Sequence, residues 1–167
     1  MTIILILGVI CLFGYFYLKD QKMKDLEEAQ LAARIKAADE DAVRCLKANP
    51  NDPLLYLIQA EISNLANYLS VTCGPHEEEY PELECASVVG IASTMISDGE
   101  VSEALRCLAQ TRENIKKAPR PWPEFIRDAV KAIGETESGI YTRLPAETAE
   151  TISSYVMSRT SRDLKAD

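Results

Sequence analysis

The chain opens with an apolar segment and continues as a series of amphipathic patterns. Residues 1–18, MTIILILGVICLFGYFYL, carry no charged side chain, and the sequence turns hydrophilic at Lys19 and Asp20. As an α-helix, the sixteen residues 3–18 would span about 24 Å, slightly less than a hydrocarbon core of about 30 Å. The pattern predicts an N-terminal transmembrane helix, anchored by the apolar side chains of Ile3, Leu5, Leu7, Ile10, Leu12, Phe13, Tyr15 and Tyr17.

Two other interpretations of this segment are a cleaved signal peptide and a buried N-terminal helix. A signal peptide needs basic residues before its apolar region and a small-x-small cleavage site after it. Neither occurs here, and Lys19, Lys22 and Lys24 instead follow the segment. Positively charged residues are retained on the cytoplasmic side of a membrane. We therefore expect an uncleaved single-pass anchor with its N-terminus outside and the body of the protein in the cytoplasm.

After this segment the pattern is helical throughout and indicates no pair of strands. Apolar residues recur at intervals of three and four, which predicts an all-α fold. Proline and glycine interrupt the pattern at Pro50, Gly74 and Gly99, and again at Pro119, Pro121 and Pro123. We expect helices over residues 21–48, as one helix or two broken near Asp39, and over 53–71, 85–97, 102–117, 124–134 and 145–159, followed by a frayed end.

Two stretches of the body resemble the tetratricopeptide repeat. AVRCLKANPNDPLLYLIQAEI is similar to the end of one repeat, its turn with Pro50, and the start of the next, with Tyr56 and Ala60 at positions that are usually aromatic and small. DGEVSEALRCL resembles the turn between paired helices, with Gly99 at the turn and Ala104 at the small packing position. An acidic insert between the two stretches departs from the usual spacing of about 34 residues.

The resemblance implies a domain of tetratricopeptide-like helical hairpins with a concave protein-binding surface. The expected organisation is an anchor at 1–18, a juxtamembrane helix at 19–39, the helical core at 40–118, and a C-terminal helical hairpin with a frayed tail at 119–167. On the second of these expected helices, the groove positions for a partner would be Tyr56, Gln59, Ser63 and Asn67.

Composition narrows the classes of partner. The 167 residues carry a formal net charge of −8, whereas a nucleic-acid binder needs a basic face that releases counterions from the polyanion. We therefore expect no nucleic-acid partner. Beyond Cys11, the cysteines Cys45, Cys73, Cys85 and Cys107 would form two disulfides in an oxidising compartment. Most of them have apolar neighbours, which favours buried, reduced thiols.

Candidate chemistry is sparse. His76 is the only histidine, so it is the only imidazole that could act as the base of a hydrolase triad. No sequence pattern indicates a nucleophile for such a triad. Cys73, His76 and Cys85 with a nearby glutamate would make a metal set, but no second closely spaced pair supports it. Phosphate-binding loops and zincin or esterase motifs are absent from the sequence. We therefore predict no catalytic residue, no metal site and no cofactor.

Trp122, between Pro121 and Pro123, is either a rigid aromatic knob for a partner or a ring docked on its own core. Together these patterns predict a membrane-anchored adaptor or scaffold that binds one or more proteins, or an accessory subunit of a membrane complex. The alternative is an exported, disulfide-stabilised helical chaperone or inhibitor on the outer side of the membrane.

Overall fold

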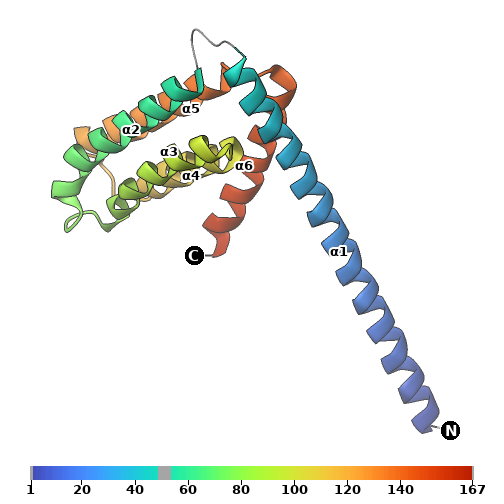
Figure 1. Cartoon of the computed structure of the whole chain (residues 1–167). Helices are drawn as coiled ribbons and strands as arrows, with labels where there is room; N and C mark the ends of the chain where they lie inside the picture. The colour runs from blue at the N-terminus through green and yellow to red at the C-terminus, as the bar shows by residue number, and fades with distance from the viewer. Residues whose placement is uncertain (1, 49–53, 167) are drawn as a thin grey trace. The chain divides into compact units, whose positions relative to one another are not determined.

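The structure is a computed structural model in which the backbone is described for residues 2–48 and 54–166, and the side chains for 18–48 and 54–162. In these residues it consists of α-helices and short 3-10 helices and has no strand (Figure 1). The predicted all-α class is therefore confirmed. The contacts divide the chain into two units, Met1–Lys36 and Ala37–Asp167.

The first unit is the N-terminal part of helix α1, which spans Thr2–Lys47 without a break at Asp39. Of the two alternatives predicted for residues 21–48, the single helix is the correct one. The predicted transmembrane segment lies, apart from Leu18, outside the residues whose side chains are described. Across the residues that are described, none of the helices is both long enough and apolar enough to cross a membrane.

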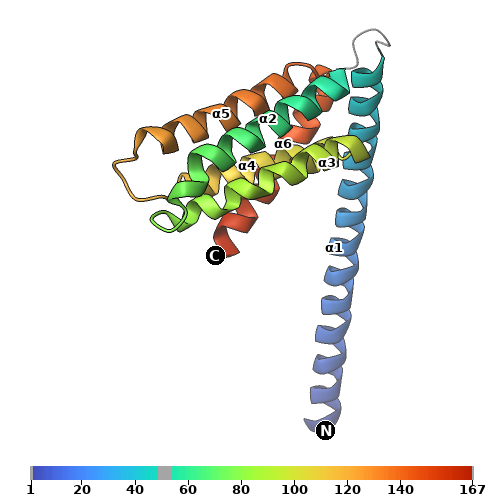
Figure 2. The same cartoon turned by 60° about the vertical axis from the view of Figure 1, so that its left-hand side comes forward.

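The second unit is a helical bundle. Its helices after α1 are α2 (Leu54–Cys73), α3 (Val89–Asp98), α4 (Val101–Ile115), α5 (Glu124–Tyr141) and α6 (Ala146–Ala166). Both α2 and α4 pack against α3 and against α5, so α2 to α5 close a ring around one core, and α6 packs on α4 (Figures 1 and 2). Fully buried side chains from every helix of the ring fill this core, among them Ile58, Ile62, Leu69, Ile96, Leu105, Leu108, Ile126, Ile133 and Ile140.

The last turns of α1 are tied to the starts of α4 and α6. The backbone N–H of Ser102 donates to Oδ1 of Asp39 at 2.7 Å, and its hydroxyl donates to Oδ2 at 2.8 Å. The hydroxyl of Thr148 donates to Asp41 at 2.7 Å. The first N–H groups of a helix have no partner within it, so a carboxylate placed there satisfies them and interacts favourably with the helix dipole.

Helix α5 is longer than the sequence pattern predicts. We expected it to end at Gly134, but it continues to Tyr141. Glycine inside a helix costs about 1 kcal/mol relative to alanine, and the burial of Ile133 and Ile140 on one side of α5 offsets this cost. The helical backbone of α6 likewise continues to Ala166, past the predicted end at Arg159.

The connection between α2 and α3 also differs from the prediction. Two 3-10 helices, Gly74–His76 and Pro81–Val88, replace the expected acidic loop and the first turn of the next helix. The ring of Phe125, at the start of α5, stacks on His76 with 4.1 Å between centroids and meets Tyr80 edge-on. These aromatic contacts fix the connection against the bundle.

Gly99 ends α3 in the left-handed conformation, with φ of 85°. We predict that Gly99→Ala destabilises the fold by about 1–2 kcal/mol, because a side chain is strained in this conformation. The added Cβ would also lie 3.3 Å from Cγ2 of Val43. Urea unfolding of the purified chain measures the change.

The matched control is Gly139→Ala on α5, where an added Cβ meets no atom within 4 Å. This substitution should leave stability unchanged or raise it by up to about 1 kcal/mol. Equal effects of the two substitutions would contradict the role assigned to Gly99.

Candidate functional site

The outer side of α2 is unusual in this acidic chain because it is exposed and nearly uncharged. Glu61 is the single charged residue among the 20 of α2. At 100° per residue, its large exposed apolar side chains fall within an arc of about 120° on the side away from the core. These are Tyr56, Leu57, Tyr68 and Val71, which are 67, 45, 41 and 77% exposed. Apolar side chains grouped on a surface in this way mark an interaction site.

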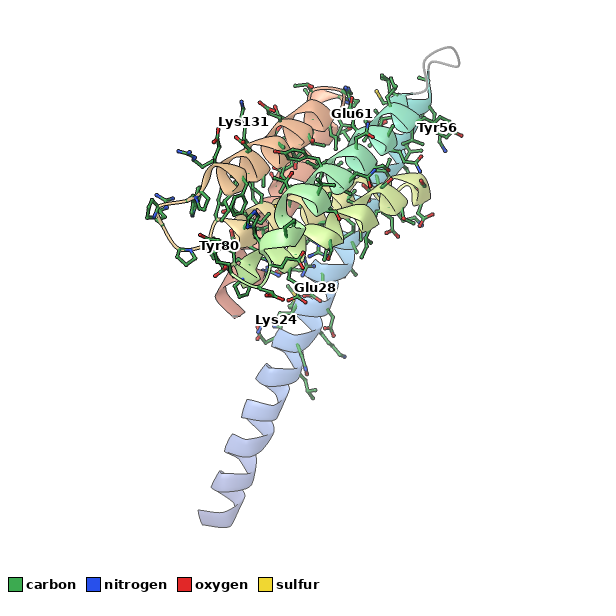
Figure 3. All side chains as sticks on the ribbon, turned by 90° about the vertical axis from the view of Figure 1, so that its left-hand side faces the viewer. Lys24, Glu28, Tyr56, Glu61, Tyr80 and Lys131 are labelled. Carbon is green, nitrogen blue, oxygen red and sulfur yellow. The ribbon has the colours of Figure 1, made fainter. Side chains whose placement is uncertain are left out.

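The groove positions predicted from the sequence follow the edge of α2 that meets α3. Tyr56 and Asn67 are exposed, and Figure 3 shows Tyr56 near the start of α2. Ser63 is half-buried, and its Oγ lies 2.9 Å from Oγ of Ser93 on α3. The carbonyl of Gln59 accepts hydrogen bonds from both serine hydroxyls. Gln59 and Ser63 therefore join the two helices, whereas Tyr56 and Asn67 face solvent.

A groove of about 540 Å³ lies along the other edge of α2, between α2 and α5. Its floor includes small or apolar side chains, and Gly139 leaves it open because no atom lies within 4 Å of the position a Cβ would take. The lining residues are Glu61, Asn64, Leu65 and Tyr68 of α2, Ala132, Glu135, Thr136 and Gly139 of α5, and Arg143. We call this the α2–α5 groove.

This groove does not follow from the sequence pattern, because residues 135–144 were expected to connect a helix over 124–134 to one over 145–159, whereas α5 extends to Tyr141. The signal that would have found it is the spacing of Ala132, Thr136 and Gly139, which follow one another at four and three residues. Such spacing places small side chains on one face of a helix. The buried residues Ile133 and Ile140, seven apart, indicate the same helix.

An ion pair between two lining residues lies at one end of the groove. The guanidinium of Arg143 donates two hydrogen bonds to Glu61, from Nη1 to Oε2 and from Nη2 to Oε1, both at 2.7 Å. This bidentate pair lowers the pKa of Glu61. Figure 3 shows Glu61 on α2. Because Arg143 follows α5, the pair fixes the end of α5 against α2.

A second ion pair holds α5 from the side opposite the groove. Nη1 of Arg112 on α4 lies 2.5 Å from Oε2 of Glu137, which is 7% exposed. Oε1 of Glu137 is buried and has no hydrogen-bond partner. Burial raises the pKa of Glu137 to about 7. The positive charge of Arg112 lowers this pKa in part, and the negative charge of Glu113 raises it by a smaller amount.

The other residues singled out in the sequence have internal roles in the structure. Trp122 is half-buried against the core, its Nε1 donates to the carbonyl of Ala118 at 2.9 Å, and the guanidinium of Arg120 lies 4.5 Å from its ring centroid. The four described cysteines are free thiols. Burial raises the pKa of Cys73 and of Cys85 to about 11, so these thiols are protonated at neutral pH.

Over the part of the chain that the structure describes, no group of three or more histidine, cysteine, aspartate or glutamate side chains is placed to hold a metal ion. The chain matches no protein-family model, and neither a curated protein nor a solved structure is significantly similar to it. Fold and site together define a helical bundle that has an uncharged outer face on α2 and a groove beside it.

The buried carboxyl of Glu137 should make stability depend on pH. Because its pKa in the folded chain is about 7, above the ordinary value, its protonated form is favoured by folding. The associated stability is fully present below about pH 4.5 and is lost as pH rises through about 7. We predict that Glu137→Gln flattens this fall, which amounts to about 2–3 kcal/mol, in urea unfolding measured from pH 4.5 to 8.

Glu135→Gln serves as the control, since that side chain lies on the same helix but is 69% exposed. Its unfolding profile should keep the slope of the unsubstituted chain. The assignment would be wrong if the two variants had the same profile.

Proposed function

We propose that this protein is a membrane-anchored helical adaptor that holds a segment of a partner protein in the α2–α5 groove. The observation that carries the proposal is the groove itself. It is large enough for several side chains of a partner, and its rim presents Tyr68 and Asn64, both exposed. Tyrosine is among the residues that contribute most to protein interfaces. The absence of a catalytic pattern in the sequence agrees with binding rather than turnover.

The chemistry of the lining indicates the occupant. Ala132, Thr136 and Gly139 allow a partner backbone to approach α5 closely, as small residues do between packed helices. Leu65 offers an apolar contact, while Asn64 and Thr136 offer hydrogen bonds. Glu135 adds a 69% exposed carboxylate at the rim, 3.8 Å from Nζ of Lys131. An amphipathic helix that carries apolar anchors and one basic side chain fits these requirements.

The membrane anchor rests on residues 1–18, which are uncharged, and on the lysines at positions 19, 22 and 24 that follow them. A tether of this kind raises the effective concentration of the bundle at a membrane, so that weak contacts with membrane-bound partners become sufficient for assembly. The same lysines favour a cytoplasmic bundle with the N-terminus outside.

Photo-crosslinking in cells tests the groove. A benzophenone amino acid at Asn64 or Glu135, on opposite walls, should give an adduct of the same mass. The same group at Glu150, exposed on α6, should not. Gly139→Leu fills the groove without an atom within 4 Å of its Cβ, so it should reduce the adducts at least tenfold. Adducts at all three positions, or adducts that survive Gly139→Leu, would refute the proposed site.

The anchor and its orientation are tested separately. Glu150→Cys introduces an accessible thiol on the bundle, for labelling with a membrane-impermeant maleimide. The chain should remain in the membrane fraction at alkaline pH, deletion of residues 1–18 should release it, and labelling should require permeabilised cells. Labelling of intact cells would instead support the exported alternative.

A further inference from the structure

A stripe of apolar and basic side chains runs along α1 directly after its uncharged N-terminal segment. Leu18, Met23 and Leu26 are 60, 50 and 52% exposed, and Lys19 and Lys22 lie among them. Together these five side chains line a hollow of about 440 Å³ on the surface of the helix. At 100° per residue they fall within an arc of about 140°. We call this surface the α1 stripe.

The charges around this part of α1 are unevenly distributed. The four carboxylates of residues 19–28 all lie outside the arc of the stripe. One of them, on Asp20, is paired with Lys24 at 2.7 Å, and Figure 3 shows Lys24 on α1. Among the side chains that the structure describes, no carboxylate forms an ion pair with Lys19 or Lys22. The stripe therefore presents two ammonium groups without a paired carboxylate.

The order of the charges along α1 favours contact with an anionic surface at the end of the uncharged segment. Lys19 and Lys22 lie within about 6 Å of Leu18 along the helix axis, and the one carboxylate in this interval is paired with Lys24. The next carboxylate, on Asp25, lies about 10 Å beyond Leu18. The surface potential of a membrane falls off within a Debye length of about 8 Å. The two lysines therefore experience this potential more strongly than the carboxylates farther along.

The apolar side chains of the stripe extend the apolar surface of the anchor on one side of α1. Residues 3–18 would span about 24 Å, less than a hydrocarbon core of about 30 Å. Met23 and Leu26 continue the apolar surface for about two further turns. A lysine lays its alkyl part along such a surface while its ammonium group stays in the polar layer. Lys19 and Lys22 suit this arrangement because they line the same hollow as the apolar side chains.

We propose that the α1 stripe binds the headgroups of anionic phospholipids in the membrane that holds the anchor. The ammonium groups of Lys19 and Lys22 bind the anionic oxygens of the headgroup, while Leu18, Met23 and Leu26 lie against the adjoining part of the acyl chains. This role depends on the membrane anchor proposed above. It gives the anchored chain a preference for membranes that are rich in anionic lipid.

The lipid preference of the full chain in phosphatidylcholine vesicles tests the stripe. A trace of spin-labelled phosphatidylserine should associate with the chain about fivefold more strongly than spin-labelled phosphatidylcholine, since one lysine near an anionic lipid contributes about that factor. The double variant Lys19→Gln/Lys22→Gln should bind the two lipids equally. Equal association with the unsubstituted chain, or a preference that survives in the double variant, would overturn the proposal.

The matched control is the double variant Asp20→Asn/Lys24→Gln, which removes a lysine outside the stripe and leaves the net charge unchanged. It should keep the preference for phosphatidylserine. A loss as large as that of the Lys19 and Lys22 variant would show that the stripe is not the binding surface.

Flotation separates this test from that of the anchor. The unsubstituted chain should float with vesicles of phosphatidylcholine alone, because the uncharged segment holds it there. A chain that stays behind would refute the anchor and the stripe with it. A chain that floats but shows no lipid preference would refute the stripe alone.

Photo-crosslinking tests the apolar part of the stripe. A benzophenone amino acid at Leu26 should capture phospholipid in the same vesicles. The same group at Glu28, two residues farther along and on the opposite side of α1, should capture at least fivefold less. Equal capture of lipid at the two positions, or capture of a second copy of the chain at Leu26, would contradict the proposed contact.

Discussion

The position of α5 depends on the buried contact between Arg112 and Glu137. This pair attaches the middle of α5 to α4, while Arg143 attaches its end to α2. With both in place, α5 closes the ring of helices and supplies one wall of the groove. Burying a carboxylate carries a large desolvation penalty, and one oxygen of Glu137 has no hydrogen-bond partner. In proteins generally, replacing a buried ion pair by well-packed apolar residues is often neutral or stabilising.

Much of the fold follows from the sequence, because its helices are separated by strong local signals. Helices end or begin in the structure at the signals that the sequence shows locally. These signals are Gly99, the Gly-Pro pair after Cys73, and the prolines before α5. Most core positions of α2 could be predicted for the same reason, since Ile58, Ile62, Leu65 and Leu69 repeat at three and four residues. Leu57, which the same pattern assigns to the core, is instead 45% exposed. Patterns of this kind require no knowledge of distant contacts.

The rest depended on contacts between segments that are far apart in the chain. The low helix propensity of glycine predicts a helix end at Gly134. In the structure Gly134 lies next to the side chain of Arg112 on α4, and α5 continues past it to Tyr141. Once α5 was taken to end at Gly134, its wall of the groove could not be anticipated. The predicted positions on α2 illustrate the same limit of local reasoning. Tyr56 and Asn67 are exposed, whereas Ser63 is engaged by Ser93, thirty residues away.

The reactivity of the buried cysteines reports local opening of the bundle. Only a thiolate attacks thiol reagents readily, and Cys73 and Cys107 are almost fully buried, with pKa values raised by that burial. Their modification therefore has to wait until the helices around them separate. Since Cys73 ends α2 and Cys107 lies within α4, their two reaction rates report how often different parts of the ring come apart, without any added label.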